Sequence, residues 1–243
     1  MIGVIFKKIE TILRKTPFHP QWIILRHEKM NLIDICSSIK VSVLDIGCAD
    51  KKPKKYLSDE IIYYGIDYYS TATEWYNTKP DIFTDAQDIS IKDESFDNVL
   101  LLDVLEHLPN PRASIKETYR VLKPSGKLIL QVPFLYPIHD APLDFHRWTK
   151  YGLYNIATEA NFSVVEEKYY GEPVETACLL FNLALTKSLL NMIKSKNPLS
   201  LVLLLALPFM IVLSNLLSLI GKGILPKDKF MPLGYRIILD KNL

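Results

Sequence analysis

The sequence predicts an α/β fold in which a mostly parallel sheet carries helices on both faces. Apolar segments with the character of strands alternate with amphipathic helical segments between residues 41 and 170. The expected strands are 41–46, 61–67, 96–102, 127–132 and 162–170, and the expected helices lie near 111–121 and 150–160. Such alternation is typical of parallel sheets, because each crossover helix returns the chain to the same edge.

The segment 43–67 joins the first two expected strands and indicates a nucleoside site. The first strand leads into a turn with Gly47, and the second strand ends at Asp67, 22 positions after Asp45. A strand that ends at a small-residue turn, with a carboxylate about 20 residues later, is typical of sheets that hold a nucleoside. A dinucleotide would need G-x-G-x-x-G for its pyrophosphate, and only Gly47 is present. The pattern favours an adenosine-type cofactor without a pyrophosphate.

Length, charge and cysteines narrow the class of protein. The 243 residues suffice for one α/β domain plus an insertion. A net charge of +2 gives no basic face for nucleic acid, so small molecules or membrane-linked substrates are expected. Cys36, Cys48 and Cys178 lack metal-ligand spacing and even pairing, which is typical of a reducing cytoplasm. The first 15 residues are a poor secretion signal, so we expect a cytoplasmic protein, peripheral at the inner face of the membrane.

Two regions fall outside the alternating pattern. Residues 2–15 predict a basic amphipathic helix, which either packs on its own domain or lies on a membrane surface. Residues 173–196 are leucine-rich, and the 22 residues of 199–220 are almost entirely apolar around Pro208, which reaches the length of a membrane span. Membrane contact is therefore expected through residues 174–222.

The segment after this apolar region looks like a strand again, which limits how the region can meet a membrane. If residues 235–239 join the same sheet as 162–170, both ends of the insertion lie on one side of a bilayer and a single crossing is excluded. Three arrangements stay open: a re-entrant hairpin broken at Pro208, an in-plane helix, and a soluble lobe that acts as a lid or dimer face. The expected segments are an N-terminal helical part at 1–38, a core at 39–172, the insertion at 173–230 and a C-terminal strand at 231–243.

Several segments together resemble one known family. They are VLDIGCAD at 43–50, YYGIDYY at 63–69, DAQDIS at 85–90, the block 95–133 and HDAPLDFHRWT at 139–149. In this order and spacing they resemble class I S-adenosylmethionine-dependent methyltransferases, most closely the type-11 methyltransferase domain family, over residues 40–170. The resemblance implies a Rossmann-like sheet of seven strands with the last strand antiparallel, and S-adenosyl-L-methionine as the cofactor.

The resemblance also implies a cofactor site at the strand ends. Its residues are Asp45, Gly47, Cys48, Ala49, Asp67, Tyr68, Asp85, Ala86, Leu102 and Asp103. In the family the first loop meets the amino-acid part of the cofactor, and Asp67 is similar to the acid that holds both ribose hydroxyls. Asp85 resembles the carboxylate that accepts a hydrogen bond from the adenine amino group. Asp103 lies where, in the family, the methionine end of the cofactor meets the acceptor.

Ala49 departs from the family, which usually has a second glycine at this position. A positive φ would cost an alanine about 1–3 kcal/mol, enough to weaken cofactor binding about tenfold or more. We expect a negative φ, because the rest of the motif is intact. Failure at this position would favour the alternative function, a non-catalytic cofactor-binding or membrane-scaffolding protein of the same fold.

Histidines are the candidate bases, because transfer to a hydroxyl or an ammonium requires loss of a proton. His139 is favoured over His107 and His146, since it lies just past the fifth strand, at the carboxyl edge where such sheets bind ligands. Asp144 joins His139 and His107 in the catalytic set. For Asp144 and Arg147, an ion pair that shapes the loop is favoured over direct contact with the substrate.

A metal site is a separate hypothesis. Asp103, Glu106 and His107 would share one face of a helical turn and could hold a divalent ion. The pattern resembles the acidic-x-x-Glu-His arrangement of magnesium-assisted quinone-precursor and small-RNA O-methyltransferases. The same LEH also occurs in metal-free relatives, where it packs the helix start, and we expect no metal here.

The sequence thus predicts a methyltransferase that acts on an oxygen or nitrogen of a small molecule, a sugar or a lipid-linked intermediate. An NAD-dependent oxidoreductase is disfavoured by the missing glycines. The N-terminal helix, the loop 134–149 and the insertion would set the acceptor, and none carries a pattern with one chemical meaning.

Overall fold

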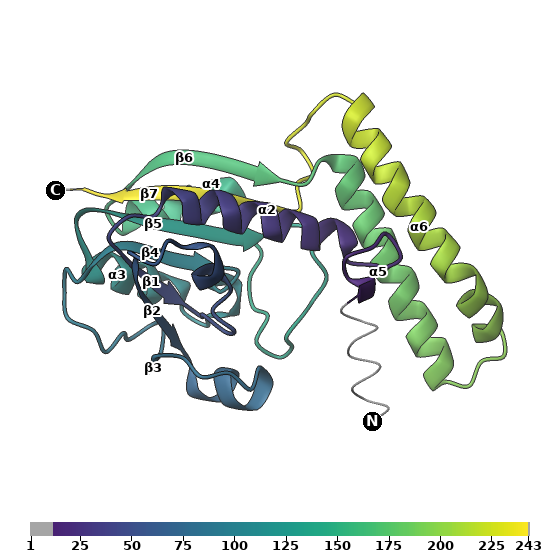
Figure 1. The fold of residues 1–243 in the computed structure, drawn as a ribbon, viewed down its shortest axis with the longest axis horizontal. Coiled ribbons are helices and arrows are strands. Elements are labelled where there is room, and N and C mark those ends of the chain that lie inside the picture. The colour runs from purple at the N-terminus through teal and green to yellow at the C-terminus, as the bar shows by residue number, and fades with distance from the viewer. Residues whose placement is uncertain (1–11, 243) are drawn as a thin grey trace. The chain divides into compact units, whose positions relative to one another are not determined.

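A computed structural model describes residues 12–242 of the chain (Figure 1). Most of the helix predicted at 2–15 lies outside the described residues. The described chain forms two compact units by its internal contacts. The sheet unit comprises Met30–Tyr170 and Gly234–Leu243, and the hairpin unit comprises Gly171–Leu233 with the chain up to Lys29. Residues 30–38 thus group with the sheet, whereas the four predicted segments placed them in an N-terminal part.

Seven strands form one sheet in the order β3-β2-β1-β4-β5-β7-β6. They are β1 (Ser42–Ile46), β2 (Ile62–Asp67), β3 (Ile82–Phe83), β4 (Phe96–Leu102), β5 (Leu122–Pro133), β6 (Phe162–Tyr170) and β7 (Gly234–Lys241). Neighbours pair in parallel except β7, which is antiparallel to both β5 and β6. The predicted seven-stranded, mostly parallel sheet with an antiparallel last strand is therefore confirmed.

Helices cover both faces of this sheet, because alternate side chains of each buried strand point to opposite faces. On one face, Val43, Leu100 and Ile129 pack with Ile35 of α2 (Trp22–Ser38) and with Ile39 just after it. The opposite face packs against α3 (Pro111–Val121) and α4 (Lys150–Glu159), through a cluster that includes Leu44, Val99, Leu101, Ile115, Leu153 and Ile156. Both predicted helices, near 111–121 and 150–160, are present.

The start of α3 follows from its sequence. The Asn110 side chain accepts a hydrogen bond from the Ala113 amide (3.2 Å), and Pro111 occupies the first turn, where no partner for its nitrogen is needed. Three short helices lie in the loops at the ends of strands: η1 (Lys52–Tyr56), η2 (Thr71–Trp75) and η3 (Leu105–His107). The residues that carry chemistry lie in or beside these loops.

The hairpin unit contains α5 (Pro173–Lys194) and α6 (Ser200–Ile224), which pack along one another. By length and composition alone, each is long and apolar enough to cross a membrane. Helix α6 continues through Pro208, which contradicts one of the three arrangements left open, the re-entrant hairpin broken at this residue. Pro208 is exposed, while the neighbouring Leu207 and Ile211 pack against Leu189 of α5 and hold the helix on both sides of the proline.

Candidate functional site

The carboxyl ends of β1 and β4 meet at the point where the sheet order reverses. From β1 the chain builds outward through β2 and β3, and it then returns to place β4 on the other side of β1. Ligands of open α/β sheets bind at this switch point. Gly47, just after β1, has φ 70°, and a Cβ built on it would lie 2.4 Å from Cγ2 of Val104. The turn after β1 therefore requires glycine at this position.

Asp67, the last residue of β2, is tied to the turn after β1. Its Oδ2 accepts a hydrogen bond from the Ala49 amide (2.9 Å), and its Oδ1 accepts one from the Tyr68 amide (2.8 Å). Asp67 is only 6% exposed, and burial raises its pKa although both amides oppose the shift. Each carboxylate oxygen accepts about two hydrogen bonds. Each oxygen of Asp67 therefore keeps one position at which it can accept a further hydrogen bond.

Ala49 has φ 40°, so the prediction of a negative φ was wrong. The turn must bring the Ala49 amide onto the Asp67 carboxylate, and it does so in the left-handed region of the backbone. Lys51, two residues later, is also left-handed, with φ 56°. An L side chain is strained in this region, whereas the glycine usual at this position would not be.

Asp45 and Cys48 are buried beside the turn. The Tyr63 hydroxyl donates to Oδ2 of Asp45 (2.5 Å), which joins β1 to β2. Asp45 is 3% exposed, and burial raises its pKa to about 7, against the opposing hydrogen bond from Tyr63. Burial also raises the pKa of the Cys48 thiol to about 12, so this thiol stays protonated. Both residues support the turn from within the sheet unit.

The other predicted cofactor residues lie at the same edge. Asp85, after β3, accepts hydrogen bonds from the amide (2.8 Å) and side chain of Gln87, so its carboxylate shapes its own loop. Asp103, after Leu102 at the end of β4, has φ 54° and accepts a hydrogen bond from Nε2 of Gln131 in β5 (2.9 Å). Ala86 packs against the sheet core, and the Tyr68 side chain is exposed. Their roles toward a cofactor stay predictions.

A buried carboxylate faces two imidazoles beside this edge. Oε1 of Glu106 lies 3.7 Å from Nε2 of His107 and 3.9 Å from Nε2 of His139. Glu106 is fully buried, and among the described residues neither of its oxygens has a hydrogen-bond partner. Burial, and next the charge of Asp103, raise the pKa of Glu106 well above its usual value.

The two imidazoles are held in place by the loop after β5. Nδ1 of His107 lies 2.8 Å from the Leu143 carbonyl, so it carries the proton it donates and Nε2 is left as an acceptor. Nδ1 of His139 lies 3.4 Å from Oδ2 of Asp144, and the two rings meet edge to face at 4.8 Å. Sequence spacing had grouped Glu106 and His107 with Asp103; the fold brings His139 to them instead.

Asp144 forms the expected ion pair with Arg147. The guanidinium donates to both carboxylate oxygens, at 2.5 and 2.7 Å, and also to the carbonyls of Tyr136 and Pro137. The Arg147 hydrogen bond, more than any other cause, lowers the pKa of Asp144 to about 2. Asp144 therefore stays ionised near neutrality, where it shapes the loop and faces His139. His146 turns its ring toward Trp148 instead.

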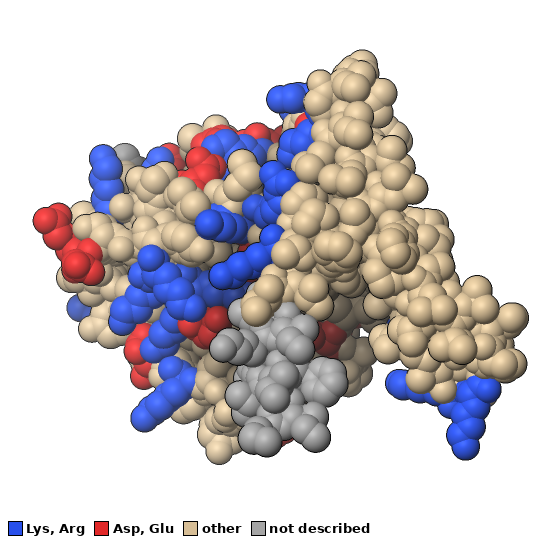
Figure 2. Space-filling view, turned by 45° about the vertical axis from the view of Figure 1, so that its right-hand side comes forward, with Lys and Arg blue, Asp and Glu red and all other residues tan. Residues whose placement is uncertain are grey.

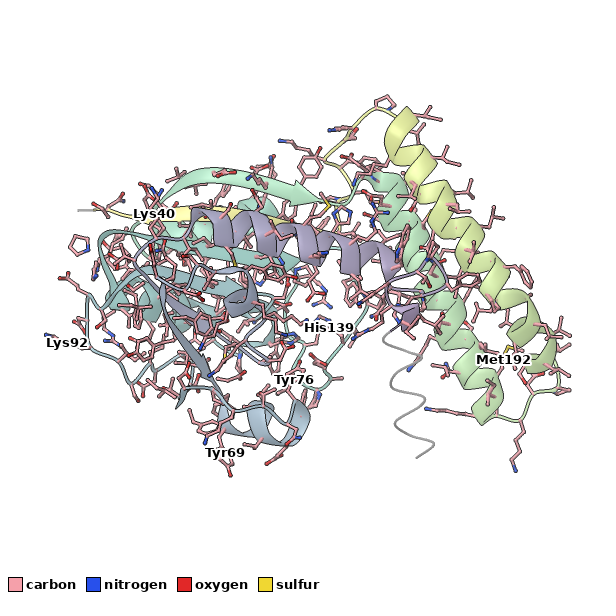
Figure 3. All side chains as sticks on the ribbon, in the orientation of Figure 1. Lys40, Tyr69, Tyr76, Lys92, His139 and Met192 are labelled. Carbon is pink, nitrogen blue, oxygen red and sulfur yellow. The ribbon has the colours of Figure 1, made fainter. Side chains whose placement is uncertain are left out.

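Tyr76 and Asp140 were not found from the sequence. The Tyr76 hydroxyl, from the segment after η2, donates to Oδ2 of Asp140 in the loop after β5 (2.7 Å). Burial and the Asp140 hydrogen bond raise the pKa of Tyr76. Figure 3 labels Tyr76 and His139, which lie toward the same end of the sheet unit. Tyr76 lies outside the segments that resemble the family, and Asp140 lies in the segment 139–149 with no role expected for it, so only the folded chain connects the two.

A known protein family matches part of the sheet unit. Residues 44–130 match a family model described as a methyltransferase domain. The 27-O-demethylrifamycin SV methyltransferase of Amycolatopsis mediterranei is 31% identical over an alignment 100 residues long that covers 36% of this chain and 37% of that enzyme. The match thus spans little more than a third of the relative's length.

Two solved structures share the fold at low sequence identity. A SAM-dependent methyltransferase from Archaeoglobus fulgidus is 17% identical with a TM-score of 0.54, over 96% of this chain and 99% of that one. The [4+2]-cyclase SpnF is 14% identical with a TM-score of 0.54, over 88% and 81%. Because a cyclase has the same fold, the fold alone does not determine the reaction.

Proposed function

We propose that the chain is a class I methyltransferase that moves a methyl group from S-adenosylmethionine to an oxygen or nitrogen of a small molecule, a sugar or a lipid-linked intermediate. The observation that carries the proposal is the hydrogen bond from the Ala49 amide to Asp67. It holds the glycine turn after β1 beside the carboxylate that stands where the family binds ribose.

The residues at this edge suit S-adenosylmethionine better than a dinucleotide. The open acceptor position on each oxygen of Asp67 suits a pair of ribose hydroxyls. Counted from Gly47, the second and third glycines of G-x-G-x-x-G are replaced by Ala49 and Lys52. Their side chains oppose the close backbone approach that a pyrophosphate requires.

When bound, S-adenosylmethionine supplies a methyl carbon that the acceptor's lone pair attacks while the carbon–sulfur bond breaks and its electron pair stays on sulfur. The chain's own residues must orient the acceptor and remove its proton. We assign the role of proton acceptor to Nε2 of His139. Ionised Asp144 faces Nδ1 of the same ring, which favours the tautomer with a proton on Nδ1 and a free lone pair on Nε2.

A second candidate, metal-assisted transfer, is favoured by Glu106, His107 and His139. One ligand atom from each lies within 4.8 Å of the others. A buried carboxylate without a hydrogen-bond partner, next to two imidazole nitrogens, is a donor set that suits a divalent cation. The Leu143 carbonyl and Asp144 would orient the two rings from behind. Methyl transfer that continues undiminished in excess chelator would eliminate this candidate.

Thermal unfolding with different ligands tests the proposed function. S-adenosylhomocysteine at about 100 times its Kd should stabilise the chain by about 2.7 kcal/mol, or several degrees, and NAD should not. A shift with NAD alone would favour the oxidoreductase, and a shift with neither would favour a scaffold that binds no cofactor. Incubation with methyl-labelled S-adenosylmethionine and fractionated extracts then identifies the acceptor.

A further inference from the structure

Helix α6 has an outer face made only of apolar side chains. The outer α6 face comprises the exposed residues Leu201, Val202, Leu204, Leu205, Phe209, Leu213, Leu216, Leu217, Ile220 and Ile224. Leu205 and Phe209 are 68% and 77% exposed, and only 28% of the apolar stretch of α6 is buried. The core helix of a soluble protein would be mostly buried, so packing within the described chain does not account for this composition.

The exposed side of α5 is different. Its exposed residues include Lys187, Ser188, Asn191 and Lys194 together with the apolar Phe181, Leu190 and Ile193, whereas α6 has no charged residue from Ser200 to Gly221. Figure 2 shows a broad tan surface, which is free of Lys, Arg, Asp and Glu, over the α5–α6 hairpin, and blue Lys or Arg side chains at its lower end. The exposed side of α5 is therefore mixed, with lysines among apolar residues, and that of α6 is apolar. This asymmetry suits a boundary between water and hydrocarbon better than immersion of the whole hairpin.

Lysines stand at both ends of the apolar stretch. Lys194 and Lys196 precede it at the turn between the helices. Lys227 and Lys229 follow it on either side of Asp228, and Lys222 donates a hydrogen bond to Glu175 (3.1 Å). Cations at both ends match a surface of anionic lipid headgroups that both ends can touch. If the hairpin crossed the bilayer, one of the two lysine groups would be carried to the far side.

The path of the chain agrees with a hairpin that stays on one side of a bilayer. Tyr170 at the end of β6 pairs with Gly234 at the start of β7, so both connections to the hairpin leave from paired residues of one folded sheet. The polar groups of α6 point inward: Asn215 accepts a hydrogen bond from Nδ2 of Asn182 (3.0 Å), and Ser214 donates to the Cys178 carbonyl (3.4 Å). None of these groups would need water on the outer α6 face.

We infer that α6 lies in the plane of one leaflet of an anionic bilayer, with the outer α6 face among the acyl chains and the lysines of both ends at the headgroups. The inference rests on α5 and α6 alone and does not depend on the methyl-transfer reaction. A chain without transferase activity would give the same result in the experiments below.

Flotation of the full chain with vesicles of phosphatidylcholine and phosphatidylglycerol tests the membrane contact. The wild type should float with the vesicles, and Phe209→Lys should lower the bound fraction about tenfold or more, because a cation then enters the hydrocarbon. Tyr151→Lys is the matched control, since Tyr151 is 70% exposed on α4 of the sheet unit, and it should float like the wild type. Circular dichroism verifies that each variant is folded.

Two results would overturn the inference: a wild type that stays with the soluble fraction, or a Phe209→Lys variant that floats as well as the wild type. Sedimentation without vesicles identifies the other occupant of this face. The wild type could be a dimer and Phe209→Lys a monomer, with neither chain bound to vesicles. This result would show that a second copy covers the outer α6 face.

A labelled turn separates the in-plane helix from a crossing hairpin. Ser195→Cys, in a Cys178→Ala background, places an exposed thiol between the two helices, while Cys36 and Cys48 are buried. Added to the outside of intact vesicles, an impermeant maleimide should label Cys at this position completely. Protection until detergent is added would mean that the turn has crossed the bilayer, which contradicts the in-plane placement.

Discussion

Three residues of the turn after β1 share the left-handed region of the backbone: Gly47, Ala49 and Lys51. Only the first is a glycine, and the turn keeps its form because the Ala49 amide is bound to the buried Asp67 carboxylate. Strain that is held in place by a specific contact is typical of binding sites. Ala49 and Lys51 thus both adopt a conformation that favours glycine.

Ala49→Gly should relieve that strain. A left-handed L residue costs roughly 1–2 kcal/mol, part of which the flexibility of glycine in the unfolded chain offsets. We expect the free energy of unfolding to rise by about 1 kcal/mol in urea titrations. Ala113→Gly, in the first turns of α3, is the control and should lower it instead. Equal destabilisation by both variants would mean that Ala49 is not strained.

Asp45 should make stability depend on pH. Its folded pKa of about 7 exceeds the ordinary value of about 4, so the folded chain holds a proton that the unfolded chain releases between these values. This contribution is complete below about pH 4 and is lost as the pH rises through about 7. Asp45→Asn removes the titration but keeps an oxygen that can accept the Tyr63 hydroxyl.

Urea unfolding of both chains at pH 5 and pH 7.5 measures this effect. The wild type should lose more stability than Asp45→Asn over the interval, because all other titrating groups are common to both. A difference between the two chains that is the same at both pH values would contradict the raised pKa of Asp45.

Single residues were predictable where a strand end and a motif coincide. Asp67 and Gly47 meet because the carboxyl ends of parallel neighbours share an edge, which follows from the alternation of strands and helices. Glu106 and His139 meet across a loop, and no periodic pattern relates their positions. The left-handed conformation of Ala49 was not predicted, because an alanine in the sequence does not reveal that its amide must donate a hydrogen bond to Asp67.

At the scale of elements, the α5–α6 hairpin is specified by a small polar cluster. Asn215 is fully buried; its Nδ2 donates to the carbonyls of Pro17 (2.6 Å) and His19 (3.2 Å), and its Oδ1 accepts from Asn182. The hydrogen bond between these two buried amides fixes the register of two otherwise uniform leucine-rich helices. If one helix shifted along the other, both amides would lose their partners.

Asn215→Leu should destabilise the hairpin by about 2–3 kcal/mol, since the Asn182 amide and the Pro17 carbonyl lose a partner. The double variant Asn182→Leu with Asn215→Leu should cost less than the sum of the single variants, because the Asn182 amide is then gone. Thermal unfolding of the four chains measures the coupling, with the exposed Asn191→Leu as a control. Strictly additive costs would mean that the two amides do not interact.

Elements were predictable in proportion to their length. The long apolar helices α5 and α6 and the strands of five or more residues carry enough periodicity to be recognised. Strand β3 has only two residues, and β5 begins at Leu122, earlier than expected, where its register beside β4 is irregular. Pro208 did not end α6, because packing of the residues around it against α5 outweighs one lost backbone hydrogen bond.

At the scale of the whole molecule, the sheet order fixes where a ligand can bind but not what reaction follows. The β1–β4 switch point places Gly47, Asp67 and Asp103 at one edge. A methyltransferase and a cyclase share this fold with the chain, so the chemistry depends on side chains at that edge and on the loop after β5.

The central claim is that Asp67 at this edge holds the ribose of S-adenosylmethionine, and calorimetric titration with S-adenosylhomocysteine tests it most directly. The wild type should bind, and Asp67→Asn should weaken binding about tenfold to a hundredfold, the loss of a hydrogen bond to a charged group. Asp88→Asn, exposed in the loop after β3, should bind like the wild type. Equal affinity of Asp67→Asn and wild type, or no binding by either, would contradict the claim.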